Sequence, residues 1–176
     1  MQGIFQGVLW IIIVYTLFSF IFTFDKTYIY FSLFITCISI FTLCISQILK
    51  EHVFNDRINH YITTHAIAPI AFVFFLLFIR EFVNTKSLIP LWDKIIKVVI
   101  VLGILSAFVT VFIIKLINNI PFHTYFEFIF NGILILMLLI ISIILIKKRN
   151  TLTRIFVGGA VILLLAIFVY LISNVN

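Results

Sequence analysis

Charged side chains are scarce in this sequence, at 10% of 176 residues, whereas 64% of the residues are hydrophobic and the mean hydropathy is +1.33. A soluble domain has roughly 25% charged residues and needs them to cover a surface that faces water. The composition therefore excludes an ordinary soluble protein and indicates an all-α membrane protein. At this length we expect one transmembrane helical domain over residues 1–176.

Cysteine is also rare, with Cys37 and Cys44 in the same apolar run. A separation of seven residues puts the two thiols on about the same face of a helix but two turns apart, which is too far for a disulfide. We therefore expect both to be small side chains that face lipid or the protein core.

The sequence also lacks the usual signatures of chemistry. It has no recognisable nucleophile–base pair, metal-ligand cluster or phosphate-binding loop, so we expect neither enzyme activity nor a cofactor. The histidines His52, His60, His65 and His123 have no spacing that suggests ligation of haem or metal. The net charge of +6 is spread over short gaps between apolar runs, so nucleic acid is not an expected partner.

Long hydrophobic runs are what the sequence has in abundance. Each is near the 20 residues that a helix needs to cross a bilayer, and none alternates apolar with polar residues as a barrel strand would. The sequence therefore predicts six transmembrane helices. Their approximate ranges are 4–24, 28–49, 61–79, 98–117, 124–146 and 155–173.

The few basic residues are distributed unevenly between the gaps. Counted along the chain, the odd-numbered gaps hold nine Lys and Arg residues and the even-numbered gaps hold three. Because short cytoplasmic connections carry the excess of basic residues, this split predicts that the odd gaps face the cytoplasm. The expected location is a bacterial inner membrane, with the N-terminus outside.

One stretch, FIREFVNTKSLIPLWDKIIK at 78–97, holds six of the eighteen charged side chains. We interpret it as the longest cytoplasmic connection, whose charges stand in water. Pro90 suits the first turn of a helix, Trp92 is expected at headgroup depth, and Asp93, Lys94 and Lys97 are expected to face outward. The predicted topology and readout loop comprises Arg80, Lys86, Pro90, Trp92, Asp93, Lys94 and Lys97.

Proline and glycine are few, and their positions suggest packing or hinge roles. Pro69 lies within the third run and has two readings that the sequence leaves open: a tolerated kink, or a hinge in a signalling helix. Small residues mark expected helix contacts, because they let backbones approach in lipid. They are Gly3 and Gly7 in the first run, Ser32, Thr36, Ser39 and Ser46 in the second, and Gly103, Ser106, Ala107 and Thr110 in the fourth.

Several segments together resemble a known family. They are GIFQGVLW and VYTLFSFIF in the first run, DKTYIYFSLFI after it, FFLLFIREFVNTKSLIPLWDKIIK, and RNTLTRIFVGG before the sixth run. The pattern resembles the membrane domain of bacterial seven-transmembrane receptors with diverse intracellular signalling modules. An acidic–basic–small–Tyr turn of that family corresponds to Asp25, Lys26, Thr27 and Tyr28, with Tyr30 following.

The resemblance implies a receptor domain that relays a periplasmic stimulus to a cytoplasmic output module. It also implies an N-terminus outside, a seventh helix that this chain lacks, and sensor and output domains in a full-length protein. The expected partners are the lipid bilayer and a second copy of the chain in a homodimer. The alternative is an accessory or scaffold subunit of a larger membrane complex, or a small bundle that transports lipid or small molecules.

Overall fold

The computed structural model describes residues 2–45 and 57–117, together with 132–133, 136–137, 139–144 and 158. The chain divides into two compact units, Met1–His123 and Thr124–Asn176, and the helices discussed below belong to the first. The predicted run at 155–173, apart from residue 158, and most of the run at 124–146 lie outside the described residues. The six-helix count therefore stays a prediction, as does the single domain.

The described part of the chain is all-helical and contains no strand. Four of its helices are long and apolar enough to cross a membrane, and they overlap the first four predicted runs, although the fourth candidate span, Pro90–Phe112, begins well before the predicted 98–117. The helices are α1 Gln2–Thr23, α2 Lys26–Ile45, α4 Arg57–Phe82, the short α5 Thr85–Leu88, and α6 Pro90–Ile117. The predicted fold class and these four spans are thus confirmed.

The turn between α1 and α2 is tight, because only Phe24 and Asp25 connect the two helices. Phe24 ends α1 in the left-handed conformation, with φ 52°, and its N–H donates to the carbonyl of Phe20. Asp25 then caps α2, since its Oδ1 accepts the backbone N–H of Thr27 at 2.9 Å. A reversal this short forces α1 and α2 to pack as antiparallel neighbours.

The connection between α4 and α6 is shorter than predicted. Helix α4 continues to Phe82 and α6 already begins at Pro90, so only 83–89 separate them, including the single turn of α5. Asn84 adopts the left-handed conformation that often follows the end of a helix, with φ 53°. Pro90 is the first residue of α6, as predicted, where its missing N–H costs no helical hydrogen bond.

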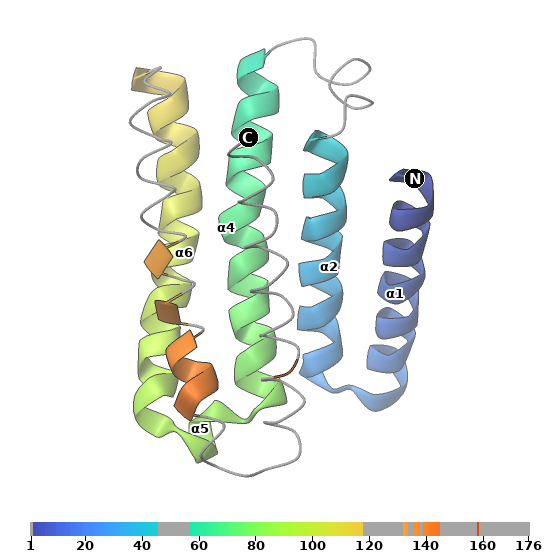
Figure 1. Cartoon of the computed structure of the whole chain (residues 1–176), viewed down its shortest axis with the longest axis vertical. Helices are drawn as coiled ribbons and strands as arrows, with labels where there is room; N and C mark the ends of the chain where they lie inside the picture. The colour runs from blue at the N-terminus through green and yellow to red at the C-terminus, as the bar shows by residue number, and fades with distance from the viewer. Residues whose placement is uncertain are drawn as a thin grey trace. The chain divides into compact units, whose positions relative to one another are not determined.

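The long helices form a row in which each packs on its neighbour in the chain: α1 on α2, α2 on α4, and α4 on α6 (Figure 1). The up-and-down path places the α1–α2 turn and the α4–α6 corner at the same end. The sequence predicted this when it assigned the first and third gaps to one side. Core side chains with no exposed surface include Leu76 and Ile79 on α4 and Ile96 on α6.

Aromatic rings join α2 to α4. Phe31 and Phe34 of α2 contact Phe78 and Phe75 of α4, with ring centroids 5.1 and 5.0 Å apart. On α4 the series continues to Phe82, whose ring lies 5.3 Å from that of Phe78. Each such pair contributes roughly 0.5–1.5 kcal/mol beyond the area it buries. The ladder therefore fixes the rotation of α4 against α2 along the half of α4 that leads to the α4–α6 corner.

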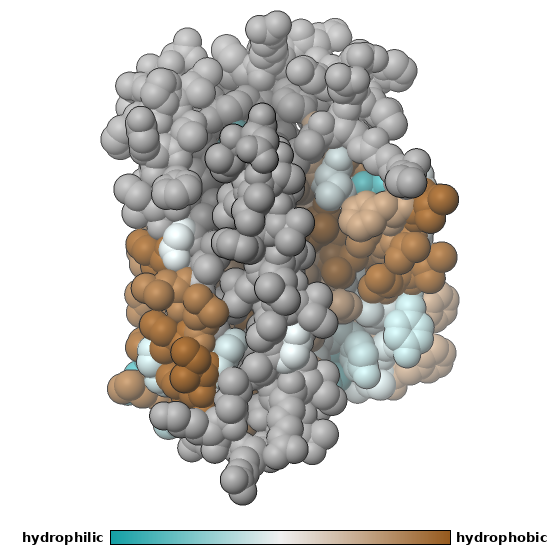
Figure 2. Space-filling model, viewed as in Figure 1, coloured by the Kyte–Doolittle hydropathy of each residue, from teal (hydrophilic) through white to brown (hydrophobic). Residues whose placement is uncertain are grey.

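The outer surface of the row is strongly apolar. Large side chains such as Ile4, Ile11, Phe22 and Phe108 are 70–80% exposed. Figure 2 shows the described residues on the viewed face as mostly hydrophobic. A surface of this kind is stable against lipid chains, in agreement with the four spans.

Small residues were predicted to mark helix contacts, and on α2 and α6 several of them are indeed buried, whereas those on α1 are exposed. Ser32 and Ser39 are buried, as are Gly103 and Ala107. By contrast, a Cβ placed on Gly3 or Gly7 would meet no atom within 4 Å, so the prediction that these glycines allow a close helix contact is wrong for the described structure. The buried face of α1 instead includes Leu9, Ile13 and Thr16.

Two adjacent isoleucines on α6 test this packing. Replacing the fully buried Ile96 by Ala should lower the free energy of unfolding by about 2 kcal/mol or more, because the packed helices cannot close the space left behind. Replacing Ile95, which is 37% exposed, should cost about 0.5 kcal/mol. Unfolding by denaturing detergent in mixed micelles measures both. Equal losses would contradict the assignment of the buried face of α6.

Candidate functional site

The charged residues whose side chains the structure describes gather at one end of the bundle; α4 and α6 also include Arg57 and Lys115 near their other ends. Every Asp, Glu, Lys and Arg whose side chain the structure describes lies at the α1–α2 turn or around the α4–α6 corner. These residues are Asp25, Lys26, Arg80, Glu81, Lys86, Asp93, Lys94 and Lys97. Polar chemistry within the described bundle is therefore concentrated at this end, which we call the charged end.

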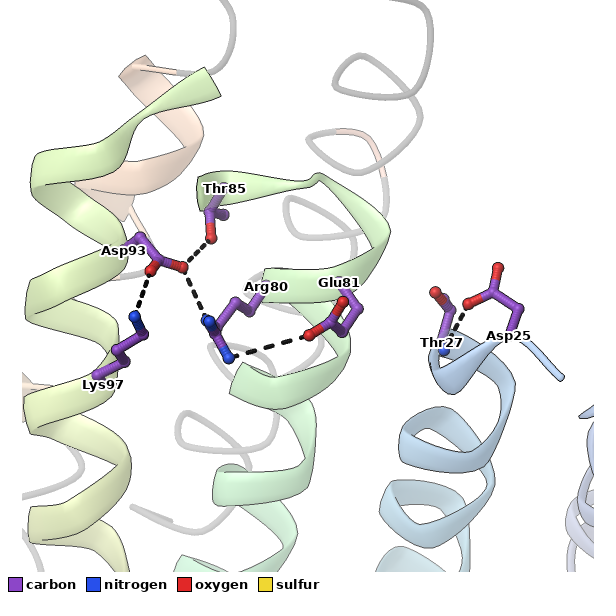
Figure 3. Close-up of polar contacts among 7 residues, drawn as sticks. All are labelled: Asp25, Thr27, Arg80, Glu81, Thr85, Asp93 and Lys97. Atoms are coloured by element: carbon purple, nitrogen blue, oxygen red, sulfur yellow. Dashed lines mark hydrogen bonds and ion pairs between the residues drawn. The ribbon is translucent and has the colours of Figure 1, made fainter. Parts of the chain in front are cut away.

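Asp93 is the centre of a cluster at the α4–α6 corner (Figure 3). Its Oδ1 accepts hydrogen bonds from Arg80 Nε and from Thr85 Oγ1, both at 2.8 Å. Its Oδ2 lies 3.0 Å from Lys97 Nζ. We refer to Asp93, Arg80, Thr85 and Lys97 as the corner cluster. A single carboxylate thereby holds α4, α5 and α6 together.

The prediction that Asp93 faces outward into water is wrong. Its side chain is only 4% exposed, because the corner folds Thr85 and Arg80 over the start of α6. Burial of an ion is unfavourable unless it is paired and its hydrogen bonds are satisfied, and here three donors fill two oxygens. The sequence reasoning treated 78–97 as a hydrated loop and so had no reason to bury a carboxylate there.

Local structure explains why these particular residues meet. Arg80 stands in the last turn of α4 and Asp93 in the first turn of α6, positions where the helix dipoles favour a cation and an anion respectively. Thr85 begins α5 and has no exposed surface. Lys97 lies one helical turn after Asp93, the spacing at which opposite charges on a helix interact. Thr85 was not singled out from the sequence, since a threonine in a polar stretch carries no periodic signal.

The other residues of the predicted readout loop remain at the surface. Lys86 and Lys94 are exposed and Trp92 is half-buried. Glu81 is near Arg80, at 3.9 Å, but this contact is long and exposed and contributes little. The predicted loop is thus two parts in the structure: the corner cluster, which is centred on the buried Asp93, and a basic surface around it.

Polar side chains also meet at the opposite end, between α1 and α2. The Gln6 amide oxygen accepts the Ser39 hydroxyl at 2.8 Å, and Gln6 Nε2 donates to Thr42 Oγ1 at 2.7 Å. We call these three residues the amide clamp. Sequence reasoning noted Ser39 only as a packing residue and missed Gln6. An amide inside the first apolar run was the signal, because lone polar groups within a membrane span usually bond to another helix.

The remaining predicted residues have plain structural positions. Asp25 and Lys26 are exposed in the α1–α2 turn, and Tyr28 and Tyr30 are half-buried on α2. Pro69 is buried within a helix that continues on both sides of it, so its role as a hinge stays a prediction.

The corner cluster makes a sharp prediction for Asp93→Asn. This change leaves the partly buried Arg80 with only the longer contact to exposed Glu81, and we expect it to lower the free energy of unfolding by about 3 kcal/mol, with little of that from the half-exposed Lys97. The matched control is Asp25→Asn, which removes the same charge at the same end but keeps a good helix cap, and should be nearly neutral. Detergent unfolding of both variants is the measurement. Equal stability of the two would show that Asp93 is an ordinary surface residue.

The chain was compared with known proteins as a whole. The family model described as 7TM diverse intracellular signalling matches residues 1–176. No curated protein and no solved structure matches the chain. The match spans the full length, includes all the helices described above, and agrees with the resemblance inferred from the turn and corner segments. This multi-pass membrane protein therefore belongs to the 7TM diverse intracellular signalling family.

Proposed function

We propose that this domain relays a stimulus from the periplasmic side of a bacterial inner membrane to an output module on the cytoplasmic side. The observation that carries the proposal is the corner cluster. One buried carboxylate ties the end of α4 to the start of α6 through Arg80, Thr85 and Lys97. A junction of this kind converts a small helix shift into a discrete change of the connecting segment.

The orientation rests on the charge distribution. The charged end has five basic residues, Lys26, Arg80, Lys86, Lys94 and Lys97, whereas the other ends of the described helices have two, Arg57 of α4 and Lys115 of α6. Short connections rich in Lys and Arg stay on the cytoplasmic side. The charged end is then cytoplasmic, and the start of α1 and the amide clamp are near the outer face.

A continuous path of contacts leads from the outer face to the corner. The amide clamp joins α1 to α2 near the N-terminus of α1. The aromatic ladder joins α2 to α4 and ends at Phe82, two residues after Arg80. Movement of α1 or α2 can therefore rotate or shift α4. The physical argument for transmission is that each junction is a specific packed or hydrogen-bonded contact.

The corner cluster suits a switch because its bonds are made or broken as a set. A shift of α4 by a fraction of a turn would remove Arg80 from Asp93 and leave the buried carboxylate with the half-exposed Lys97 as its remaining counter-charge in the cluster. Intermediate positions are unfavourable for the same reason, so two arrangements are favoured over a continuum. The exposed Lys86 and Ser87 of α5, with Lys94 beside them, would present this change of the corner to a cytoplasmic module. We also propose that the chain acts as a homodimer.

Sidedness is tested with single cysteines in a background that replaces the two native ones, Cys37→Ser and Cys44→Ser. A membrane-impermeant thiol reagent applied to intact cells should label Gly3→Cys and should not label Ser87→Cys, since both native positions are exposed at opposite ends of the bundle. Permeabilised cells should allow labelling of both. Labelling of both positions, or only of Ser87→Cys, in intact cells would exclude the proposed orientation.

Coupling between the two ends is tested with a double-mutant cycle. Gln6→Leu breaks the amide clamp, which joins α1 to α2. Because α2 contacts α4 through the aromatic ladder, we expect the shift to reach the corner and to change the labelling rate of Ser87→Cys in permeabilised cells. In the presence of Asp93→Asn, which already opens the corner, the same change should have no further effect.

The control in this cycle is Thr36→Val on α2. The Thr36 hydroxyl donates to the Ser32 carbonyl of its own helix and, among the described residues, bonds to no other helix, so this variant should leave the labelling rate unchanged. Additive effects of Gln6→Leu and Asp93→Asn would show that the two ends act independently, and the relay proposal would then fail while the topology stood.

A further inference from the structure

An apolar groove runs between α4 and α6, within their membrane spans. Its volume is about 370 Å³, and all nine residues that line it are apolar, five from α4 and four from α6. The lining residues that the structure describes offer no hydrogen-bonding side chain, so a polar solute would lose its hydration there without compensation. A hydrocarbon chain is the chemistry that such a groove accepts.

Both walls of the groove lead to a cation at the charged end. On α4 the lining residues Ala66 and Val73 are followed, at the same spacing of seven, by Arg80. On α6 the lining residues Val111 and Ile104 are preceded, again at seven, by Lys97. Residues seven apart on a helix differ by only about 20° in direction, so each cation stands on the row that forms its wall.

The two cations at the foot of the groove differ in how accessible they are. Arg80 and Lys97 both contact the single carboxylate of Asp93, and Lys97 remains 51% exposed. Glu81 approaches Arg80 only at 3.9 Å from an exposed position. Lys97 therefore keeps an accessible ammonium group that can bond to the phosphate of a phosphodiester headgroup.

The depth of the groove also fits a lipid. With a rise of 1.5 Å per residue, Ile104 lies roughly 10 Å and Val111 roughly 21 Å from Lys97 along α6. A leaflet of the hydrocarbon core is about 15 Å thick. Measured from Lys97, the α6 wall of the groove therefore overlaps the deeper part of one leaflet, where the end of an acyl chain would lie, and continues past the middle of the bilayer at Val111.

We propose that the α4–α6 groove and the corner cluster together form a binding site for one anionic phospholipid, with its phosphate at Lys97 and Arg80 and one acyl chain between the two helices. The lipid phosphate would supply a second acceptor for cations that Asp93 alone does not neutralise. The state of the corner cluster thereby depends on the lipid composition of the cytoplasmic leaflet. The site is independent of whether the domain relays a signal.

The test uses Trp92, which lies one residue from Asp93, in a Trp10→Phe background that leaves it the only tryptophan. The purified chain in maltoside micelles is titrated with phosphatidylglycerol or phosphatidylcholine brominated on the acyl chain, and quenching of Trp92 is followed. We expect phosphatidylglycerol to quench at a lower mole fraction. Lys97→Gln should weaken this preference about fivefold, and Lys97→Arg should keep it.

The matched control is Lys86→Gln, which removes the same charge at the same end from a residue outside both rows, and should leave the preference unchanged. An equal effect of Lys86→Gln and Lys97→Gln, or equal quenching by the two lipids, would reduce the observation to diffuse surface charge or to ordinary surrounding lipid and would overturn the proposal.

A second arm tests the acyl chain. Ala107→Leu adds bulk inside the groove and should weaken retention of phosphatidylglycerol in native mass spectrometry. Glycerol phosphate, which has the headgroup charge but no chain, should not displace the lipid. Displacement by glycerol phosphate would assign the site to a free anion, and unchanged retention in a folded Ala107→Leu variant would place the lipid elsewhere; either result contradicts the proposal.

Discussion

The arrangement of this domain at its charged end depends on one buried carboxylate. Asp93 accepts bonds from Arg80 of α4, Thr85 of α5 and Lys97 of its own helix, and has almost no contact with water. An ion in such surroundings is stable only while its partners hold it, so the positions of three helices are linked to one another. The short connection, the left-handed Asn84 and the proline that opens α6 all serve to bring these partners within reach.

The rest of the bundle is held in a different way. In lipid the hydrophobic effect does not drive helices together, and packing and interhelical hydrogen bonds must do so. The aromatic ladder between α2 and α4 provides packing, and the amide clamp between α1 and α2 provides hydrogen bonds. Each long helix thus makes specific contacts with the next one, so that a shift of one helix can be passed to its neighbour, as the proposed relay requires. The same construction leaves a groove between α4 and α6 where the lining includes Ala66 and Ala107.

Family membership and geometry address different questions about function. The match over the whole chain places the protein among 7TM diverse intracellular signalling domains but assigns no residue a role. The geometry singles out Asp93, Arg80 and Thr85 as the residues whose loss would alter the corner most, and Lys97 as the cation left partly free. The proposed relay and the proposed lipid site share these residues, so the charge state of one corner would connect protein movement with the surrounding membrane.

By itself the sequence determined the class, the four described spans, the common side of the first and third gaps, and the start of α6 at Pro90. These follow from run length, composition and proline geometry, which are local properties of the chain. Only the tertiary structure decided that Asp93 is buried, that Gln6 contacts Ser39, and that no described helix packs closely on Gly3 and Gly7. The reason is physical: whether a polar or small residue faces lipid, water or another helix depends on the partner that packs there. The residues near it in the chain do not specify that partner.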